Sequence, residues 1–92
     1  MGFFTGDQDL NKLQQEASDH LWNGRFRIAL PIAEKLFLSR PDDSDAAICY
    51  AWALLENGNP IKALELANLA VELKGDSTKA RVYRAYLLSR MS

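Results

Sequence analysis

Few side chains in this sequence are of the types that carry out chemistry. His20 is its one histidine and Cys49 its one cysteine. Nucleophilic catalysis needs a thiol or hydroxyl beside a base that a third group orients, and the sequence supplies no third group at a useful spacing. The stretch DDSD at residues 42–45 resembles a carboxylate cluster. It lacks the glycine and the distant glutamate of a calcium loop, and acidic residues are common at helix N-termini. We therefore predict no catalytic residue, no metal site and no cofactor, so the protein is not expected to be an enzyme.

The composition is that of an ordinary globular domain. The chain has 92 residues, of which 48% are apolar and 25% charged, and this favours one folded domain. A net charge of -1 gives no electrostatic reason to bind nucleic acid or an anionic membrane. No apolar run approaches the roughly 20 residues of a membrane helix. A single cysteine excludes an internal disulfide and suits a reducing compartment, so we predict a cytoplasmic protein without nucleic-acid or membrane partners.

The charges are unevenly distributed along the chain. Residues 74–92 carry five of the eleven Lys and Arg but one of the twelve Asp and Glu, a local charge of +4 against -5 for the rest. Such asymmetry usually marks a solvated face. The alternative is that it favours head-to-tail contacts between copies, which would make the protein a homo-oligomer.

Small residues recur at a fixed period along the chain. A shift of 34 residues aligns Asn-Gly at 23–24 with Asn-Gly at 57–58, and it superimposes several alanines. Small residues let neighbouring helices approach closely, so the period predicts stacked helices. The aligned alanines are Ala17, Ala51 and Ala85, then Ala29 with Ala63, and Ala33 with Ala67.

Local signals divide each period into two helices. Acidic residues and Ser44 precede one apolar stretch that stops at Asn-Gly, and Asn59 with Pro60 forms a good start for the next, which Gly75 should close. Pro31 removes a backbone hydrogen bond and should bend the first turns of its helix. The predicted helices are about 10–23 and 26–39 in the first repeat, one within residues 42–58, one from Pro60 to the stop at Gly75, and one at about 78–91.

These signals define the predicted domain organisation. Residues 1–9 form a flexible lead-in, 10–43 and 44–77 are two repeats, and 78–91 is a capping helix within one domain. Arg81 and Arg84 replace Ala47 and Tyr50 of the second repeat. Charges at positions that would otherwise meet a further helix are typical of a solubilising cap. The alternative is that the sequence is an excerpt whose next helix has been removed, and the polar residues favour the cap.

The period and the paired helices resemble the tetratricopeptide repeat over residues 10–92. Leu13 and Ala47 replace the large aromatic usual early in the first helix, and His20 and Leu54 replace the usual tyrosine. The resemblance implies an all-α fold of about five helices, in antiparallel pairs stacked as a short right-handed superhelix, with two full repeats and a cap. It rests on Ala17, Gly24, Ala29, Ala33 and Pro41, and on Ala51, Gly58, Ala63, Ala67 and Gly75.

In tetratricopeptide proteins the first helix of each pair lines a concave wall, and the 34-residue register transfers that wall to this sequence. Aromatic residues there offer flat apolar area with polar tips, which is typical of interaction hot spots. The alternative is that Trp22 and Trp52 only close the core between helices. The candidate partner-binding residues are Gln14, Ser18, Trp22, Ile48, Cys49, Trp52, Lys79, Val82, Tyr83, Tyr86 and Arg90.

The resemblance implies a non-catalytic protein-interaction module that binds an apolar or amphipathic peptide or helix on its concave face. Some family members grip a peptide carboxylate with Lys, Asn and Arg. Only Lys79 agrees with that pattern, because the other matching positions are Gln14, Ser18, Cys49 and Tyr83. We exclude this grip, since it would leave carboxylates unpaired. Two alternatives remain: a self-associating structural or assembly component, and a small secretion-type chaperone for a partner helix.

Overall fold

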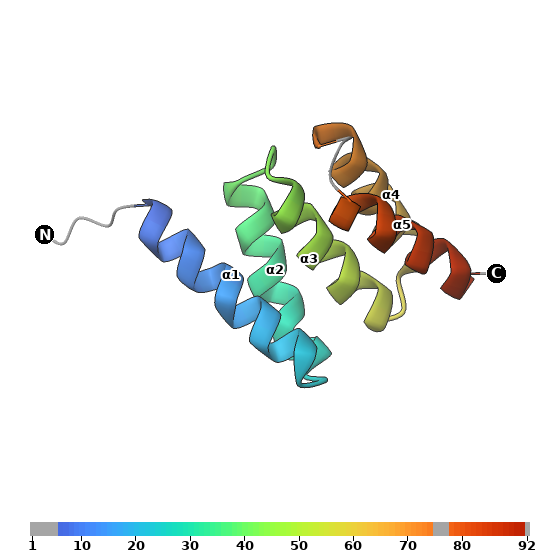
Figure 1. Cartoon of the computed structure of the whole chain (residues 1–92). Coiled ribbons are helices and arrows are strands. Elements are labelled where there is room, and N and C mark those ends of the chain that lie inside the picture. Colours follow the sequence, from blue (N-terminus) through green and yellow to red (C-terminus); the bar gives the residue numbers. More distant parts are fainter. Residues whose placement is uncertain (1–5, 75–77, 92) are drawn as a thin grey trace, which may run out of the picture.

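The computed structural model describes residues 6–74 and 78–91, and these fold into five α-helices without a strand (Figure 1). Each helix packs against its neighbours in sequence, and α3 also contacts α1 and α5. This arrangement confirms the predicted all-α, solenoid-like fold. Within the described residues no helix is long and apolar enough to cross a membrane. The helices are α1 (Gly6–Trp22), α2 (Phe26–Ser39), α3 (Ser44–Glu56), α4 (Pro60–Leu73) and α5 (Thr78–Met91).

The helix bounds follow the sequence signals except at the first helix. α1 begins at Gly6, so the lead-in predicted for residues 1–9 was drawn too long. Asp9 lies near the beginning of this helix, where a negative charge interacts favourably with the helix dipole. The rest of the predicted lead-in, residues 1–5, and the predicted stop at Gly75 lie outside the described residues.

The turn that joins α1 to α2 has the same backbone as the turn that joins α3 to α4. Gly24 and Gly58 adopt φ angles of +76° and +86°, in the left-handed region that glycine enters without steric cost. The N–H of the residue after each glycine donates to a carbonyl of the last helical turn. These bonds run from Arg25 to His20 at 2.8 Å and from Asn59 to Leu54 at 2.9 Å.

The asparagine before each of these glycines makes the same side-chain hydrogen bond in both turns. The Nδ2 of Asn23 donates to the carbonyl of Asp19 at 2.6 Å, and the Nδ2 of Asn57 donates to the carbonyl of Ala53 at 2.7 Å. Asn57 additionally donates to the carbonyl of Phe26 at 2.9 Å, which ties the second turn to the beginning of α2. The Asn-Gly repeat therefore fixes both the reversal of the chain and one contact between repeats.

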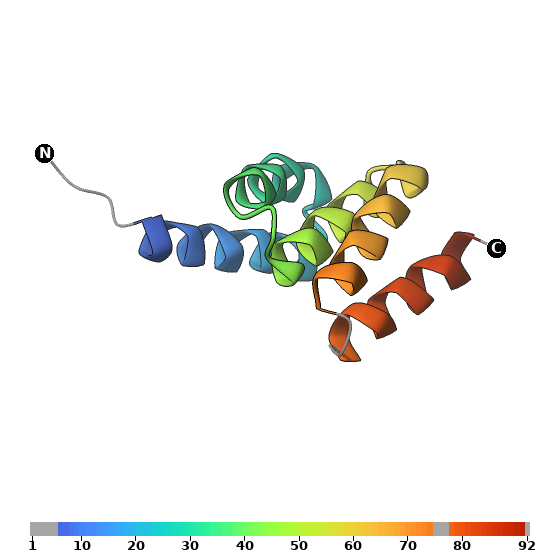
Figure 2. The same ribbon diagram turned by 90° about the horizontal axis from the view of Figure 1, so that it is seen from above.

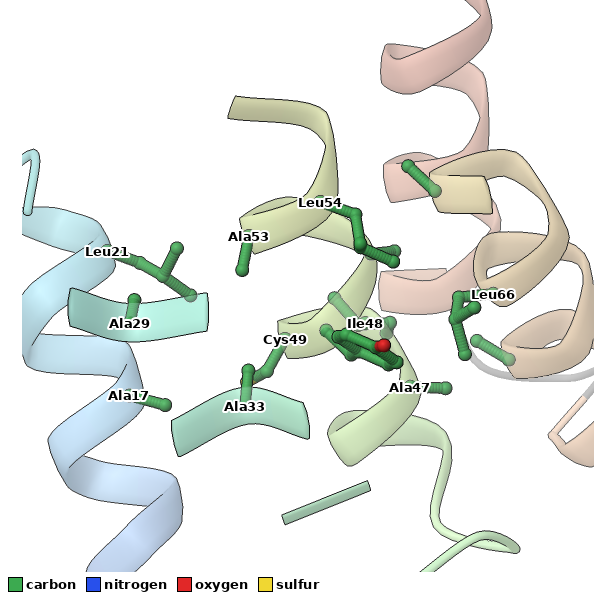
Figure 3. Packing of buried hydrophobic residues seen from close by; sticks show 14 of the residues in the cluster. Ala17, Leu21, Ala29, Ala33, Ala47, Ile48, Cys49, Ala53, Leu54 and Leu66 are labelled. Atoms are coloured by element: carbon green, nitrogen blue, oxygen red, sulfur yellow. The ribbon is translucent and has the colours of Figure 1, made fainter. Parts of the chain in front are cut away.

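The core is built largely from alanine (Figure 3). Apart from Ala85, all the alanines that the 34-residue shift aligns are fully buried, which confirms that small residues occupy the helix contacts. Ala85 is exposed, because no described helix lies across that side of α5. The largest side chains with almost no exposed area are Leu21, Leu36 and Leu87.

A polar contact between repeats shows which way Arg84 points. Tyr50 Oη lies 3.3 Å from Glu34 Oε2 across the α2–α3 contact. One period later Arg84 Nη1 donates to Asn68 Oδ1 at 3.5 Å across the α4–α5 contact. Arg84 therefore meets the preceding helix, and the prediction that it occupies a position for a following helix was wrong. Arg81 is exposed, and that α5 serves as a cap stays a prediction.

Candidate functional site

A groove of about 540 Å³ runs along one side of the stack. All of its lining residues belong to α1, α3 and α5, the first helices of successive periods, and the lining is mostly apolar. The lining residues are Ser18, Trp22, Ile48, Cys49, Trp52, Lys79, Val82, Tyr83 and Tyr86.

The groove brings together nine of the eleven candidate residues selected by the sequence register. The other two are Gln14, which is half-buried on α1, and Arg90, which lies near the end of α5 beside Tyr86. The register therefore located the wall of one groove. That these side chains bind a partner stays a prediction.

Two tryptophans form one end of the groove wall. The rings of Trp22 and Trp52 meet edge to face, with centroids 5.0 Å apart and planes at 84°. The Trp22 side chain is 78% exposed, whereas Trp52 is half-buried and packs partly against the core. The interpretation that both tryptophans only close the core is therefore wrong for Trp22. A large apolar ring that is exposed to solvent and packs against an aromatic neighbour is typical of a surface that contacts another protein.

The opposite wall carries a second aromatic pair. The rings of Tyr83 and Tyr86 lie 6.0 Å apart on α5. Arg90 lies over the ring of Tyr86, 5.8 Å from its centroid, and its Nη1 donates to the Tyr86 hydroxyl at 3.0 Å. These contacts hold the Tyr86 ring in place at the groove.

Two ion pairs join α3 to α5, near the two ends of α5. Lys79 Nζ lies 3.3 Å from Asp45 Oδ1, and Arg90 Nη1 lies 2.8 Å from Glu56 Oε2. In both pairs the partners are 34 residues apart, so each joins equivalent positions of neighbouring repeats. The Lys79 pair is well exposed and contributes little to stability, whereas Glu56 is largely buried. The cations near the groove are thus already paired with acids of the protein itself.

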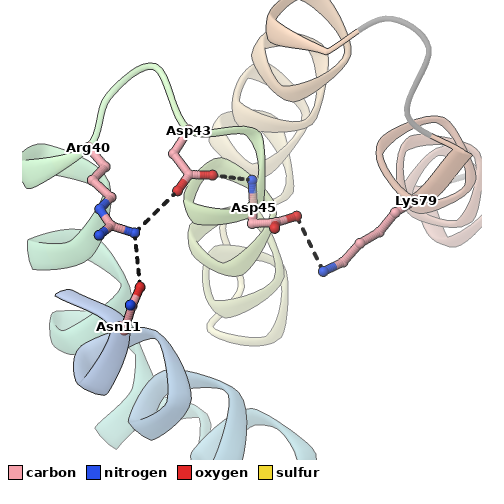
Figure 4. A network of polar contacts seen from close by, with 5 residues as sticks. All are labelled: Asn11, Arg40, Asp43, Asp45 and Lys79. Atoms are coloured by element: carbon pink, nitrogen blue, oxygen red, sulfur yellow. Dashed lines mark hydrogen bonds and ion pairs between the residues drawn. The ribbon is translucent and has the colours of Figure 1, made fainter. Parts of the chain in front are cut away.

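The acidic stretch at residues 42–45 is a helix cap (Figure 4). The carboxylate of Asp43 accepts a hydrogen bond from the backbone N–H of Asp45 at 2.9 Å, in the usual N-cap arrangement. Arg40 Nη1 lies 3.7 Å from Asp43 and donates to Asn11 Oδ1 at 3.3 Å. The capping interpretation is confirmed.

The groove contains few polar groups, and burial raises the pKa values of two of them, Cys49 and Tyr83. Burial raises the pKa of the Cys49 thiol, and a hydrogen bond with the Ser18 side chain opposes this effect. A buried, protonated thiol is a poor nucleophile. Burial also raises the pKa of the Tyr83 hydroxyl, and the nearby Glu56 carboxylate adds to that shift. Among the described residues the buried Tyr83 hydroxyl has no hydrogen-bond partner.

Replacing Tyr83 with Phe should raise the free energy of unfolding by about 1 kcal/mol, because a buried hydroxyl without a partner destabilises the fold. The pKa of the Tyr83 hydroxyl is higher in the folded chain than in the unfolded one, so ionisation of this hydroxyl opposes folding. Its ionisation does not lower the free energy of unfolding below the unfolded pKa of about 10, and it lowers that free energy as the pH rises beyond this value. Urea denaturation of both proteins at neutral and alkaline pH tests this. A less stable Phe variant would contradict the prediction.

His20 lies apart from the groove lining. Its Nδ1 accepts a hydrogen bond from Arg25 Nε at 2.9 Å, beside the first turn between helices. Within residues 6–74 and 78–91 no group of three His, Cys, Asp or Glu side chains could hold a metal ion.

One surface was missed by the sequence register. Ala85 aligns with Ala17 and Ala51, which are buried, and the register therefore suggested a buried position. Its exposure is a finding of the structure, which describes α2 packed on α1 and α4 packed on α3 but no helix packed on this side of α5.

Comparison with protein families matches most of the chain. The family model described as "Anaphase-promoting complex, cyclosome, subunit 3" matches residues 22–91, and this family is of the tetratricopeptide-repeat type. The matched range includes α2 to α5 and Trp22 of the groove. Searches among curated proteins and among solved structures returned no significant match.

Proposed function

Because this chain belongs to the family of anaphase-promoting complex, cyclosome, subunit 3, whose repeats are of the tetratricopeptide type, we propose that it binds an apolar or amphipathic segment of another protein in the groove between α1, α3 and α5. Repeats of this type typically serve as scaffolds for protein–protein interaction. In this proposal the module has no catalytic role, and the groove holds its partner without changing it.

The exposure of Trp22 is the observation that carries the proposal. Among the residues that the structure describes, Trp22 is the most exposed large apolar one, and it lines the groove together with Trp52, Val82 and Tyr86. Exposed apolar surface that is concentrated in a groove is typical of interaction sites on protein surfaces. Tryptophan and tyrosine supply much contact area for little loss of side-chain freedom, which suits them to a binding wall.

The charges around the groove indicate what kind of segment it favours. Lys79 and Arg90 already pair with Asp45 and Glu56, so they have less to offer an acidic ligand than unpaired cations would. We expect apolar side chains of the partner to provide most of the affinity. An amphipathic helix with apolar residues at i, i+3 and i+4, or an extended apolar peptide, would meet this requirement. Its affinity should change little between low and moderate salt.

Selection of peptides from a random library against the folded protein tests the proposal. We expect the enriched peptides to carry apolar residues at helical or alternating spacing. Replacing Trp22 with Ala should weaken their binding at least about tenfold, as removal of a hot-spot side chain does. Tryptophan fluorescence and calorimetry measure the dissociation constants. Trp22 is suited to this test because its exposure makes loss of folding improbable on truncation.

Matched variants separate binding in the groove from binding elsewhere. Trp52→Ala should also weaken binding, and far-UV circular dichroism must first show that this half-buried residue can be removed without unfolding. Ile61 on α4 is 71% exposed and lies outside the groove lining, so Ile61→Ala should leave the affinity unchanged. Equal affinity of wild type and Trp22→Ala would refute the groove. Loss of ligand binding through concentration-dependent dimerisation would instead support the self-associating alternative.

A further inference from the structure

Two of the five asparagines in this chain are followed by glycine, in the pairs Asn23-Gly24 and Asn57-Gly58. In such a pair the backbone nitrogen of the glycine can attack Cγ of the asparagine, because glycine has no Cβ to hinder the approach. The new N–Cγ bond closes a succinimide ring, and the side-chain nitrogen leaves as ammonia with the proton of the glycine N–H. Water then opens the ring to aspartate or isoaspartate. The other three asparagines precede lysine, proline or leucine, whose bulk or missing N–H disfavours this reaction.

The glycine N–H is held in the same way in both turns. That of Gly24 donates to the carbonyl of Leu21 at 3.2 Å, and that of Gly58 donates to the carbonyl of Leu55 at 3.1 Å. Attack on Cγ requires this nitrogen to lose its proton, so each turn must open locally before the ring can close. The rate of the reaction in the folded chain therefore depends on how often each turn opens.

The asparagine side chains of the two turns are held differently. Nδ2 of Asn23 donates to the carbonyl of Asp19 at 2.6 Å, and Nδ2 of Asn57 donates to the carbonyl of Ala53 at 2.7 Å. Asn57 Nδ2 also donates to the carbonyl of Phe26, in the preceding repeat, at 2.9 Å. Among the described residues Asn23 has no such second bond. Ring closure removes the side-chain nitrogen with all its hydrogen bonds, so the reaction breaks two of them at Asn57 and one at Asn23.

The two turns also lie at different places in the stack. Figure 2 shows α1, which ends at the first turn, at one end of the row of helices and α3, which ends at the second turn, within it. Among the described helices α1 packs against α2 and α3, whereas α3 contacts all four others. In a repeat array the end helices open most easily, so the first turn should open more often than the second.

We propose that Asn23 is a site of spontaneous deamidation in the folded chain, and that the bonds of Asn57 to Ala53 and Phe26 protect the second turn from the same reaction. The conversion consumes one water, releases one ammonia and needs no enzyme or oxidant. It adds one negative charge to the chain. The new carboxylate lies one residue from Trp22, the exposed ring of the groove, so the modification changes the charge beside that ring.

Incubation of the folded chain in ¹⁸O-labelled water at mildly alkaline pH, followed by mass spectrometry of its peptides, tests the proposal. We expect label to enter position 23 at least about fivefold faster than position 57, the effect of about one hydrogen bond together with less frequent opening. In guanidinium chloride, where both turns are unfolded, the two rates should be similar. Asn23→Ser is the matched control, which removes the reactive amide and should abolish the early uptake of label.

A second measurement tests why the fold protects Asn57. Aspartate at this position offers no N–H to the carbonyls of Ala53 and Phe26, and it adds a negative charge at the C-terminal end of α3, where the helix dipole is also negative. Asn57→Asp should therefore lower the urea midpoint of unfolding more than Asn23→Asp, which loses one bond of the same kind. Equal midpoints of the two variants would contradict the proposal.

Three results for the wild type would overturn the proposal. The first is conversion of Asn57 in the folded chain at the rate of Asn23 or faster. The second is the same ratio of rates in the unfolded chain, which would mean that the local sequence and not the fold sets the order. The last is no conversion of Asn23 in the folded chain over a time in which the unfolded chain reacts, which would mean that both turns are protected.

Discussion

The Leu36→Ala variant should unfold with a free energy about 3 kcal/mol below that of the wild type, within the range of 2–5 kcal/mol for buried leucines. Leu36 is on α2 and has no exposed area. Truncation removes apolar contacts and leaves a cavity that neighbouring helices can fill only partly. Because a domain of this size is stabilised by roughly 5–10 kcal/mol, the loss should move the urea midpoint strongly.

Leu38, two residues away on the same helix, gives the matched control. Its side chain is 69% exposed, so Leu38→Ala should change the free energy of unfolding by less than about 0.5 kcal/mol. Urea denaturation of both variants, followed by far-UV circular dichroism, measures the difference. Similar losses for the two variants would contradict the orientation of α2 described above.

The second large effect is expected from Ala51→Leu on α3. Ala51 is fully buried where helices meet, and three more carbon atoms there must push them apart. Overpacking of this kind costs about 1–3 kcal/mol and sometimes more. We expect the lower urea midpoint to be accompanied by amide shifts on α4 as well as α3, since α4 packs on the side of α3 that includes Ser44.

Ala85→Leu makes the same change one period later, at an exposed position. It should leave the free energy of unfolding within about 0.5 kcal/mol of the wild type. The pair of variants compares one register position with and without a covering helix. A large loss for Ala85→Leu would contradict the exposure of Ala85 in this structure.

The scaffold could be predicted from the sequence because its determinants are local and occur twice. Asn-Gly ends a helix by its own backbone preferences, so the turns at Gly24 and Gly58 required no knowledge of distant residues. Alanine at one period fixed which sides of the helices meet. The groove wall followed from the same register, since residues equivalent in successive helices lie on one side of the stack.

Features that depend on a particular neighbour could not be predicted in this way. Arg84 was assigned to a position that meets a following helix. Its actual contact is with the Asn68 side chain, and no local sequence pattern indicates that contact. Ala85 has the register of a buried residue, and its exposure depends on what lies beyond α5. Trp52 is less exposed than Trp22 because it packs against the core, and the ring contact between them joins positions of α1 and α3 that are not equivalent in the 34-residue register.

The order of helix contacts has a consequence for how the groove can respond to a partner. Within the described residues α1 and α5 do not pack directly against each other, yet both line the groove. In a one-dimensional array each helix is stabilised by its nearest neighbours, and the end helices open most easily. A segment that spans the groove would couple the two ends through itself. Binding should therefore raise the cooperativity of unfolding and slow amide exchange in α1 and α5 together, a readout of occupancy that needs no label on the partner.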